Sequence, residues 1–457
     1  MRVLKFGGSS VADSEAIARV ASIVARQPGA TVVVVSALAG VTDALLALAN
    51  TAAGGGNGQP GLDALIRRHH AIAATISHPQ RRQLVELSIS GFADSARATL
   101  RAISAEGRTQ APLLDKLVAV GELWSSRLVD AAVSDAGIES HWVDARGVVK
   151  TDGRHQSASP DFEATVQCLD RLVRPWLARR RVVVLGGFIG SGPDGAPTTL
   201  GRGGSDYSAT ILGACLAAEE IQIWTDVDGV LTADPHVVQD AQVLPVLSYE
   251  AAHTLARFGA KILHPRTMEP AAARGISVRV LNSFRPDAPG TRIGPAAIGG
   301  AAEASAVSSR ADIALVEIRL DHAPIEAGAI ARVFGELHDA GIAVILAELC
   351  DGRLALAVDA AADLEPLRRR LSGHTTVQVT LGKSAVCVVA APVAREARLV
   401  FDALTLLGTT PIHLMARPAG AATLGLVVDT ADALMVVRQL HDGIVARPYS
   451  PLVQGVA

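Results

Sequence analysis

Residues 1–10 read MRVLKFGGSS, and this stretch predicts the first element of the fold and the first binding feature. Residues 2–6 alternate and end in aromatic character, so they are predicted to form a strand. The glycine pair that follows ends the strand, and a helical pattern starts at about residue 10. Lysine is rare in this chain, because only five of its 42 basic residues are lysines: Lys5, Lys116, Lys150, Lys261 and Lys383. An ammonium beside two glycines is therefore expected to act as a compact point charge, which a guanidinium does not replace.

Strand-length apolar runs alternate with helical patterns through the first two thirds of the chain. Residues 31–36 (TVVVVS) and 182–190 (VVVLGGFIG) are unbroken runs typical of strands that are covered on both faces. Residues 221–227 and 276–282 look similar. Helices are predicted near residues 10–26, 42–53, 62–77, 81–104, 113–136 and 205–218. This alternation predicts an α/β fold, with a mostly parallel open sheet and helices on both of its faces.

The texture of the sequence changes after residues 284–305, which are rich in Gly, Pro and Ala and lack periodicity. We interpret this stretch as an inter-domain linker. Two β-α-β-β-α-β patterns follow it, so the remainder is predicted to contain an approximate repeat of ferredoxin-like units. Such units bind an effector or pair between subunits, and the pattern leaves both roles open.

Composition excludes several classes of protein. The chain has 457 residues, 49% of them hydrophobic and 19% charged, which indicates a core-rich protein of two or three domains. Its net charge of −3, without a basic block, argues against a nucleic-acid binder. No apolar run reaches membrane-spanning length, and no signal pattern precedes the first strand. The four widely spaced cysteines are expected to be buried, reduced thiols, which suits a cytoplasmic protein.

Glycine-rich strand ends supply candidate binding sites, because open parallel sheets bind ligands there. At residues 5–10, backbone N–H groups, a helix N-terminus and the Lys5 ammonium together suit a phosphate. At residues 182–190, Gly186 and Gly187 let a ligand approach the end of a buried strand. The first signal is weak when taken alone, because glycine pairs are common in turns.

Two further stretches carry charged side chains. Residues 200–208 (LGRGGSDYS) place an arginine among glycines, which suits a bidentate grip on a carboxylate or phosphate. Ser205 or Asp206 also suits a helix cap, and we expect capping and binding to coexist. Residues 224–235 hold several aspartates that can be ordinary turn residues, and residues 258–265 hold Lys261 ahead of a predicted helix.

These features together favour phosphoryl transfer by positioning and charge neutralisation. Two lysines and an arginine lie at predicted strand ends, and no Walker A pattern is present. No Cys/His or Ser/His arrangement competes with this interpretation. His69 and His70 fall in a helical stretch among arginines, and they are expected to face solvent.

Six motifs resemble those of the aspartate kinases, in the same order and at similar spacing: KFGGSSVAD, VVVVSALAGVTDAL, VGELWSSRL, TLGRGGSDYSA, IWTDVDGVLTADP and FGAKILHPRT. The resemblance covers nearly the whole chain. It implies an amino-acid-kinase domain at residues 1–300, followed by a tandem ACT-type regulatory region at residues 306–457. The first ACT-type unit would span about residues 311–381, inserted into a second unit made of residues 306–310 and 384–457.

The resemblance also implies a reaction. ATP, with Mg²⁺, would phosphorylate the β-carboxylate of L-aspartate to give 4-phospho-L-aspartate. This step leads to lysine, threonine and methionine and, in some bacteria, ectoine. The enzyme would form a homodimer or a larger assembly through its ACT-type units, without nucleic-acid or membrane partners.

Individual residues acquire roles from the same resemblance. The catalytic residues would be Lys5, Asp206 and Lys261. The substrate-binding residues would be Ser36, Thr42, Glu122, Arg202 and Ser205, with Glu122 on the substrate ammonium and Arg202 on a carboxylate. The nucleotide-binding residues would be Lys5, Gly7, Gly8, Ser9, Thr225, Asp226, Asp228, Asp234 and Lys261. No residue is assigned to the Mg²⁺ ion.

The regulatory half departs from the family pattern. Feedback-inhibited members carry an Asn-Ile pair and a polar stretch that hold lysine or threonine, whereas residues 341–350 and 410–416 contain no asparagine and few hydroxyls. Burying the charged ends of an amino acid without partners costs several kcal/mol. Weak or absent inhibition by lysine and threonine is therefore expected, with the paired units kept for dimerisation.

Three alternatives compete with this interpretation. The chain could be another member of the fold that acts on glutamate, N-acetylglutamate, carbamate or UMP, but the tandem regulatory half and the GRGGSD motif argue against that. A non-catalytic regulator would be expected to have lost at least one of the charged site residues. A truncated bifunctional enzyme is the third alternative, and any dehydrogenase half would then be absent from this chain.

Overall fold

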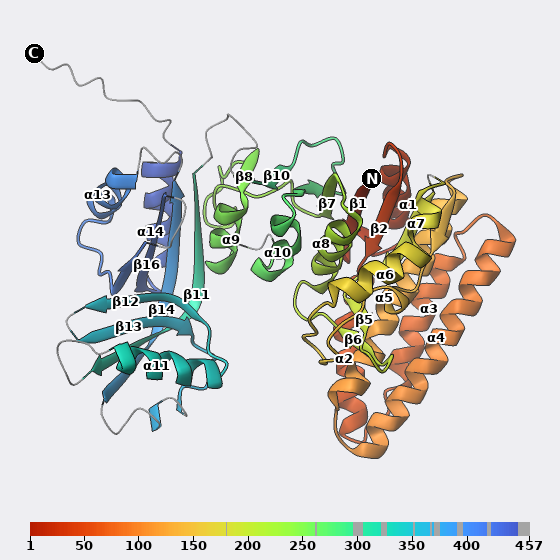
Figure 1. Ribbon diagram of the computed structural model, residues 1–457, viewed down its shortest axis with the longest axis horizontal. Helices are drawn as coiled ribbons and strands as arrows, with labels where there is room; N and C mark the ends of the chain where they lie inside the picture. Colours follow the sequence, from red (N-terminus) through yellow and green to blue (C-terminus); the bar gives the residue numbers. More distant parts are fainter. Residues whose placement is uncertain are drawn as a thin grey trace, which may run out of the picture. The chain divides into compact units, whose positions relative to one another are not determined.

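The computed structural model divides the chain into two compact units. Unit 1 comprises Met1–Val230 and Leu263–Pro295, and unit 2 comprises Leu231–Ile262 and Ala296–Ala457. Figure 1 labels many of the helices and strands of both. The structure describes residues 1–179, 181–260, 263–295, 305–320, 327–350, 352–365, 368–369, 375–390, 396–417 and 422–446.

A mostly parallel sheet runs through unit 1, as the alternation of strands and helices predicts. Its strands lie in the order β3 (Ser140–Trp142), β4 (Val182–Gly186), β2 (Thr31–Val35), β1 (Arg2–Phe6), β7 (Glu220–Thr225), β9 (Ser277–Asn282) and β10 (Thr291–Gly294). Neighbouring strands from β3 to β9 are parallel, and β10 runs antiparallel to β9. The chain adds strands on one side of β1 and then on the other. The strand order therefore reverses at β1, and open α/β sheets bind ligands at such a point.

Helices cover this sheet on both faces. The elements outside the sheet are η1 (Ser9–Val11), α1 (Ser14–Ala25), α2 (Val41–Ala53), α3 (Gln59–Ala73), α4 (Pro79–Glu106), α5 (Ala111–Asp135), η2 (Ala145–Gly147), α6 (Phe162–Leu172), α7 (Arg174–Leu177), α8 (Gly204–Leu216), α10 (Pro265–Ala273) and the hairpin of β5 (Ile189–Ser191) with β6 (Pro197–Thr199). The helices predicted from sequence are confirmed, with ends that shift by a few residues. Figure 1 shows α3 and α4 side by side in orange, with α5 packed against them.

The alternation of side chains along β1 decides which helices pack on which face. Leu4 and Phe6 are buried in one apolar cluster with Val33, Val35 and residues of α1 to α5. Val3 and Lys5 point to the opposite face, because successive strand residues alternate. Helix α8 packs on β1, β2 and β7 from that side. A lysine in a buried strand thus projects toward a helix N-terminus.

The interpretation of residues 284–305 as a linker is wrong for its first half. Residues 284–295 belong to unit 1, and β10 pairs with β9 there. Thr291 and Ile293 are buried whereas Arg292 between them is exposed, so the stretch does alternate. A strand of four residues is too short for that period to emerge among glycines and prolines. Residues 296–304 lie outside the described residues.

Unit 2 is built on an antiparallel sheet. Its order is β12 (Val344–Cys350), β13 (Arg353–Asp359), β11 (Ala306–Leu320), β14 (Thr375–Ala390), β16 (Ala422–Asp429) and β15 (Leu414–Ala416). The other elements are β8 (Val246–Ser248), α9 (Tyr249–Arg257), α11 (Ala327–Asp339), α13 (Glu396–Leu407), α14 (Ala433–Leu440) and the π-helix η5 (His441–Val445). One apolar core forms under α11, and a second forms under α13 and α14.

The two longest strands of unit 2 pass through both cores. Residues 306–310 of β11 pair with residues 385–389 of β14. Residues 315–320 of β11 pair with residues 375–380 of β14, and β13 flanks β11 over residues 313–319. The ferredoxin-like antiparallel module expected at the C-terminal end of the chain is present, whereas its predicted boundaries stay a prediction.

Two predictions about single side chains are wrong. His69 is fully buried rather than facing solvent, because it falls on the buried stripe of α3 that also holds Leu62, Ile72 and Ala73. Its ring packs 4.5 Å from that of Trp124, and burial lowers the pKa of His69 to about 4. Of the four cysteines, all free thiols, Cys350 is exposed, because it ends the edge strand β12.

Among the described residues, no helix is long and apolar enough to cross a membrane.

Candidate active site

A pocket of about 250 Å³ opens in unit 1 where β1, β2 and β4 end and α8 begins. Its lining comprises Lys5, Ser36, Thr42, Glu122, Phe188, Gly201, Gly203, Gly204, Ser205 and Asp206. These residues come from six separate stretches of the chain, and most were singled out from the sequence. The reversal of strand order at β1 therefore coincides with a cluster of charged side chains.

Lys5 and Asp206 form an ion pair inside this pocket. The Lys5 ammonium lies 2.7 Å from Oδ1 of Asp206, and both side chains are largely buried. Asp206 belongs to the first turn of α8, where the helix dipole favours negative charge. The carboxylate therefore fixes the position of the ammonium at the edge of the pocket. Gly7 lies beside the same ammonium, since a Cβ there would be 3.5 Å from it.

Glu122 of α5 brings a second carboxyl group, which is almost completely buried. Its Oε1 accepts a hydrogen bond from the Ala37 backbone N–H at 3.2 Å. Its Oε2 has no hydrogen-bond partner among the described residues. Burial raises the pKa of Glu122 to about 8. A carboxyl group held in this way favours a cationic partner in the pocket.

The end of β4 and the start of α8 meet closely at the pocket. A Cβ at Gly187 would lie 2.7 Å from that of Ser205, so only glycine lets the two segments approach in this way. Arg202 is exposed between Gly201 and Gly203, which both line the pocket, but it is not itself in the lining. Of the predicted substrate residues, the pocket thus contains Ser36, Thr42, Glu122 and Ser205, with Arg202 adjacent in sequence.

Phe188 lines the pocket but was not singled out from the sequence. Its φ is +66°, an unusual value for a bulky residue, and its N–H donates to the Ser208 hydroxyl at 2.9 Å. The glycine pair before it was the available signal. Nothing in the sequence distinguished this phenylalanine from an ordinary strand residue.

The predicted nucleotide-binding residues of unit 1 gather at the neighbouring strand ends. The Gly7 N–H donates to the Trp224 carbonyl at 3.2 Å, which places the glycine turn beside the end of β7. Thr225 ends β7, and its hydroxyl donates to Asp226 at 3.2 Å. Gly8 and Ser9 continue the turn into η1. Asp228 accepts a hydrogen bond from Asn282 at 2.8 Å and forms an ion pair with Arg285.

The two remaining predicted nucleotide-binding residues lie outside the described part of unit 1. Asp234 lies in unit 2, where its side chain accepts the His236 N–H at 2.9 Å as an ordinary turn residue does. Lys261 lies outside the described residues. The nucleotide roles of both stay predictions. The described residues contain no group of three or more His, Cys, Asp or Glu side chains that could hold a metal ion.

The arrangement suits a small zwitterion and a phosphate. Glu122 offers a buried acceptor for a cationic group, and Arg202 offers a guanidinium at the rim for an anionic group. Lys5 and the glycine turn offer positive charge and backbone N–H groups where a phosphoryl group would enter.

Comparison with known proteins places the chain among characterised enzymes. A model of the amino acid kinase family matches residues 1–282. Lysine-sensitive aspartokinase 3 of Escherichia coli (strain K12) is 32% identical over 97% of this chain and 98% of its own length. Aspartokinase 3, chloroplastic, of Arabidopsis thaliana is 31% identical over 96% of this chain and 80% of its own length. The chain also matches 38% of the length of the Zea mays bifunctional aspartokinase/homoserine dehydrogenase 1, at 35% identity.

Solved structures give the same picture. E. coli aspartokinase III in complex with aspartate and ADP (R-state) matches with a TM-score of 0.83 and 31% identity, over 97% of this chain and 99% of that chain. The same enzyme in complex with lysine and aspartate (T-state) matches with a TM-score of 0.76. The Clostridium acetobutylicum aspartate kinase matches at 0.78 with 19% identity over 97% of this chain and all of that chain, which supports the fold alone.

Proposed function

The chain belongs to the amino acid kinase family and, within it, to the aspartokinases, and from this premise we propose that it transfers the γ-phosphoryl group of ATP to the β-carboxylate of L-aspartate. The products are 4-phospho-L-aspartate and ADP. The observation that carries this proposal is the pocket that joins Lys5, Glu122 and Asp206 beside the glycine-rich residues 201–205, which include Arg202.

The substrate end of the pocket fits an amino acid with two carboxylates. The buried Oε2 of Glu122, which lacks a partner among the described residues, accepts the substrate ammonium. Arg202, with Ser205 beside it, holds the α-carboxylate, for which a guanidinium fork is well shaped. The β-carboxylate is then free to approach the phosphorus in line, so that positioning supplies much of the rate.

The phosphate end of the pocket depends on Lys5. Its ammonium, held by Asp206 at 2.7 Å, neutralises charge that develops on the transferred group. The glycine turn at residues 7–9 and the β7 end at residues 225–228 receive the nucleotide. Mg²⁺ is part of the proposal as an ion that arrives on the nucleotide phosphates and lowers their charge. No ligand for it is assigned within this chain.

The regulatory region carries the rest of the proposal. The enzyme is a cytoplasmic homodimer or larger assembly through its ACT-type units, and it catalyses the first step toward lysine, threonine, methionine or ectoine. Inhibition by lysine or threonine is weak or absent. The support for weak inhibition is residues 341–350, where Ile342, Ile345 and Leu346 are buried and no asparagine is present.

Aspartyl-hydroxamate formation tests the proposed substrate. The purified chain, ATP, Mg²⁺ and hydroxylamine are combined with aspartate, glutamate, N-acetylglutamate or UMP, and ADP release is followed in parallel. Hydroxamate with aspartate alone supports the proposal. ADP release with a different acceptor and not with aspartate overturns it. The absence of ADP release with all four acceptors also overturns it.

A further inference from the structure

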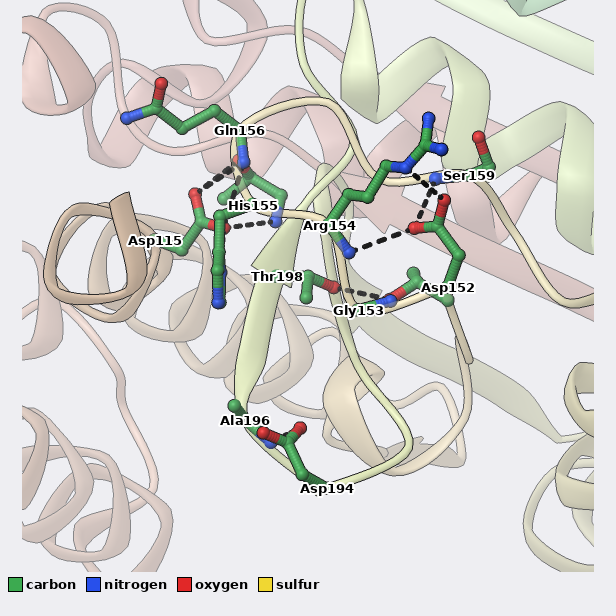
Figure 2. A network of polar contacts seen from close by, with 12 residues as sticks. Asp115, Asp152, Gly153, Arg154, His155, Gln156, Ser159, Asp194, Ala196 and Thr198 are labelled. Atoms are coloured by element: carbon green, nitrogen blue, oxygen red, sulfur yellow. Dashed lines mark hydrogen bonds and ion pairs between the residues drawn. The ribbon is translucent and has the colours of Figure 1, made fainter. Parts of the chain in front are cut away.

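A second buried carboxylate of α5 lies outside the pocket, and among the described residues it forms no ion pair with a lysine or an arginine. Asp115 is 1% exposed, and Figure 2 shows its side chain facing His155 and Gln156. Its Oδ2 lies 2.8 Å from Nδ1 of His155 and accepts the Gln156 N–H at 3.0 Å. The Thr199 N–H donates a hydrogen bond to Oδ2 at 3.2 Å, and the Thr199 hydroxyl donates one to Oδ1 at 2.7 Å. Since a carboxylate only accepts, Nδ1 of His155 carries the proton in this contact.

The partners of Asp115 come from two segments. His155 and Gln156 belong to residues 152–159, which we name the 152–159 loop. Asp152 closes this loop by accepting the N–H groups of Arg154 and Ser159, both at 3.1 Å, as Figure 2 shows. Thr199 ends β6, and one residue, Leu200, separates it from the glycine-rich segment of residues 201–205. Asp115 therefore ties the loop to the strand that leads into the active-site segment.

The 152–159 loop also contacts that segment directly. Gly201 lines the pocket and has a φ of +78°, and a Cβ there would lie 2.9 Å from the Gln156 carbonyl oxygen. The Ala158 N–H donates to the Thr199 carbonyl at 2.9 Å. The backbone on which Arg202 is mounted thus rests against a loop whose own position depends on Asp115.

We propose that Asp115 is a positioning residue: through the 152–159 loop and Thr199 it sets the place of residues 201–205, and hence of the guanidinium that receives the substrate carboxylate. The inference rests on the proposed function, because it concerns the same site. A purely structural role predicts lower stability without a selective change in substrate affinity. A positioning role predicts that affinity for aspartate suffers more than affinity for ATP.

Asp115→Asn is the informative variant, because it keeps the shape of the side chain but replaces one acceptor oxygen by an NH₂ group. We expect the KM for aspartate to rise by about tenfold or more, with the KM for ATP changed by less than about threefold. Asp135→Asn is the matched control. Asp135 lies at the other end of α5 and also accepts two backbone N–H groups, from Ser77 at 2.8 Å and His78 at 3.0 Å.

A second variant covers the case in which Asp115→Asn does not fold. Thr199→Val removes the 2.7 Å hydroxyl contact but keeps the backbone N–H and the side-chain volume. It is expected to raise the KM for aspartate in the same selective way, by a smaller factor. An unchanged KM for aspartate in the folded variants, or an equal rise in Asp135→Asn, overturns the positioning role.

Hydrogen exchange read by mass spectrometry separates this inference from the proposed function. In the absence of ligands, Asp115→Asn should speed amide exchange in residues 152–159 and 201–205, whereas Asp135→Asn should not. If the wild-type chain fails to phosphorylate aspartate, the proposed function fails, and the exchange result alone decides the positioning role. Unchanged exchange in residues 201–205 then overturns it.

Discussion

The Lys5 ammonium and Oδ1 of Asp206 are 2.7 Å apart, although the two residues are 201 positions apart in the sequence. One comes from the central strand of the sheet, and the other comes from the first turn of the helix packed on the opposite face from α1 and α5. The pair fixes a single compact cation at the point where the strand order reverses.

Replacing Asp206 by Asn should therefore impair catalysis more than folding. The Lys5 ammonium loses its carboxylate and its fixed place, so kcat is expected to fall by about 10²-fold. ADP release at saturating aspartate and ATP measures this. The control is Asp429→Asn, because Asp429 holds Lys383 in unit 2 at 2.5 Å in a comparable pair. Equal losses in both variants would contradict a catalytic role for the Lys5–Asp206 pair.

The pH dependence of aspartate binding should report Glu122. Burial raises the pKa of Glu122 to about 8, so its carboxyl group is mostly protonated in the free enzyme at neutral pH. The ammonium of aspartate requires the ionised form, so kcat/KM for aspartate should rise with pH up to about 8, by about tenfold per unit well below that value. Glu122→Gln should lower kcat/KM and remove this slope. A wild-type profile that is flat between pH 6 and 8 would count against the assignment.

The acid stability of unit 1 should depend on His69. The pKa of His69 is about 4 in the folded protein, against 6.5 for a histidine in an unfolded chain. Between these two pH values the imidazole is therefore protonated in the unfolded chain and neutral in the folded protein. The free energy of unfolding is therefore constant above pH 6.5 and falls as the pH drops toward 4, by about 3 kcal/mol from this group. Tryptophan fluorescence is the measurement, because all four tryptophans, at positions 124, 142, 176 and 224, lie in unit 1.

The matched variants for this prediction are His69→Gln and His70→Gln. The first should reduce the loss of stability below pH 6.5, and the second should leave it unchanged because His70 is only half-buried. If the free energy of unfolding falls equally between pH 7 and pH 5 in wild type and in His69→Gln, the role of His69 is refuted.

Feedback by amino acids should be weak. Lysine or threonine at about 10 mM, a concentration chosen to saturate a typical metabolite site, should leave the rate of aspartyl-hydroxamate formation nearly unchanged. Residues 341–350 and 410–416 offer mainly apolar side chains to the charged ends of such an effector. The lysine-sensitive E. coli aspartokinase 3 serves as the positive control. Inhibition by more than half at low-millimolar lysine or threonine would show the expectation to be wrong.

Local sequence features were sufficient for most strands of the unit 1 sheet and for most of its helices. The six motifs were sufficient for the family, which the comparisons confirm. Lys5 stood out because its strand alternates and lysine is rare, and its neighbouring glycines marked a strand end. The motifs also led to Glu122 and Asp206. These signals are local, so they survive without knowledge of tertiary contacts.

Other features depend on distant contacts and escaped prediction. His69 is buried because α4 and α5 cover α3. The arginines next to it in the sequence suggested an exposed position instead. The role of Asp115 becomes visible only when residues 155, 156 and 199 converge on one carboxylate. Strand β10 lacks length, and its stability comes from pairing with β9. Such features have no local sequence signal.

Aspartyl-hydroxamate formation in wild type, Lys5→Ala and Lys116→Ala, with ATP, Mg²⁺ and aspartate, tests the central claim most directly. Lys116 is an exposed lysine of α5 and controls for the loss of a positive charge. We predict product from wild type and Lys116→Ala, and none above background from a folded Lys5→Ala. Product at an unchanged rate from Lys5→Ala, or no product from wild type, would contradict the account.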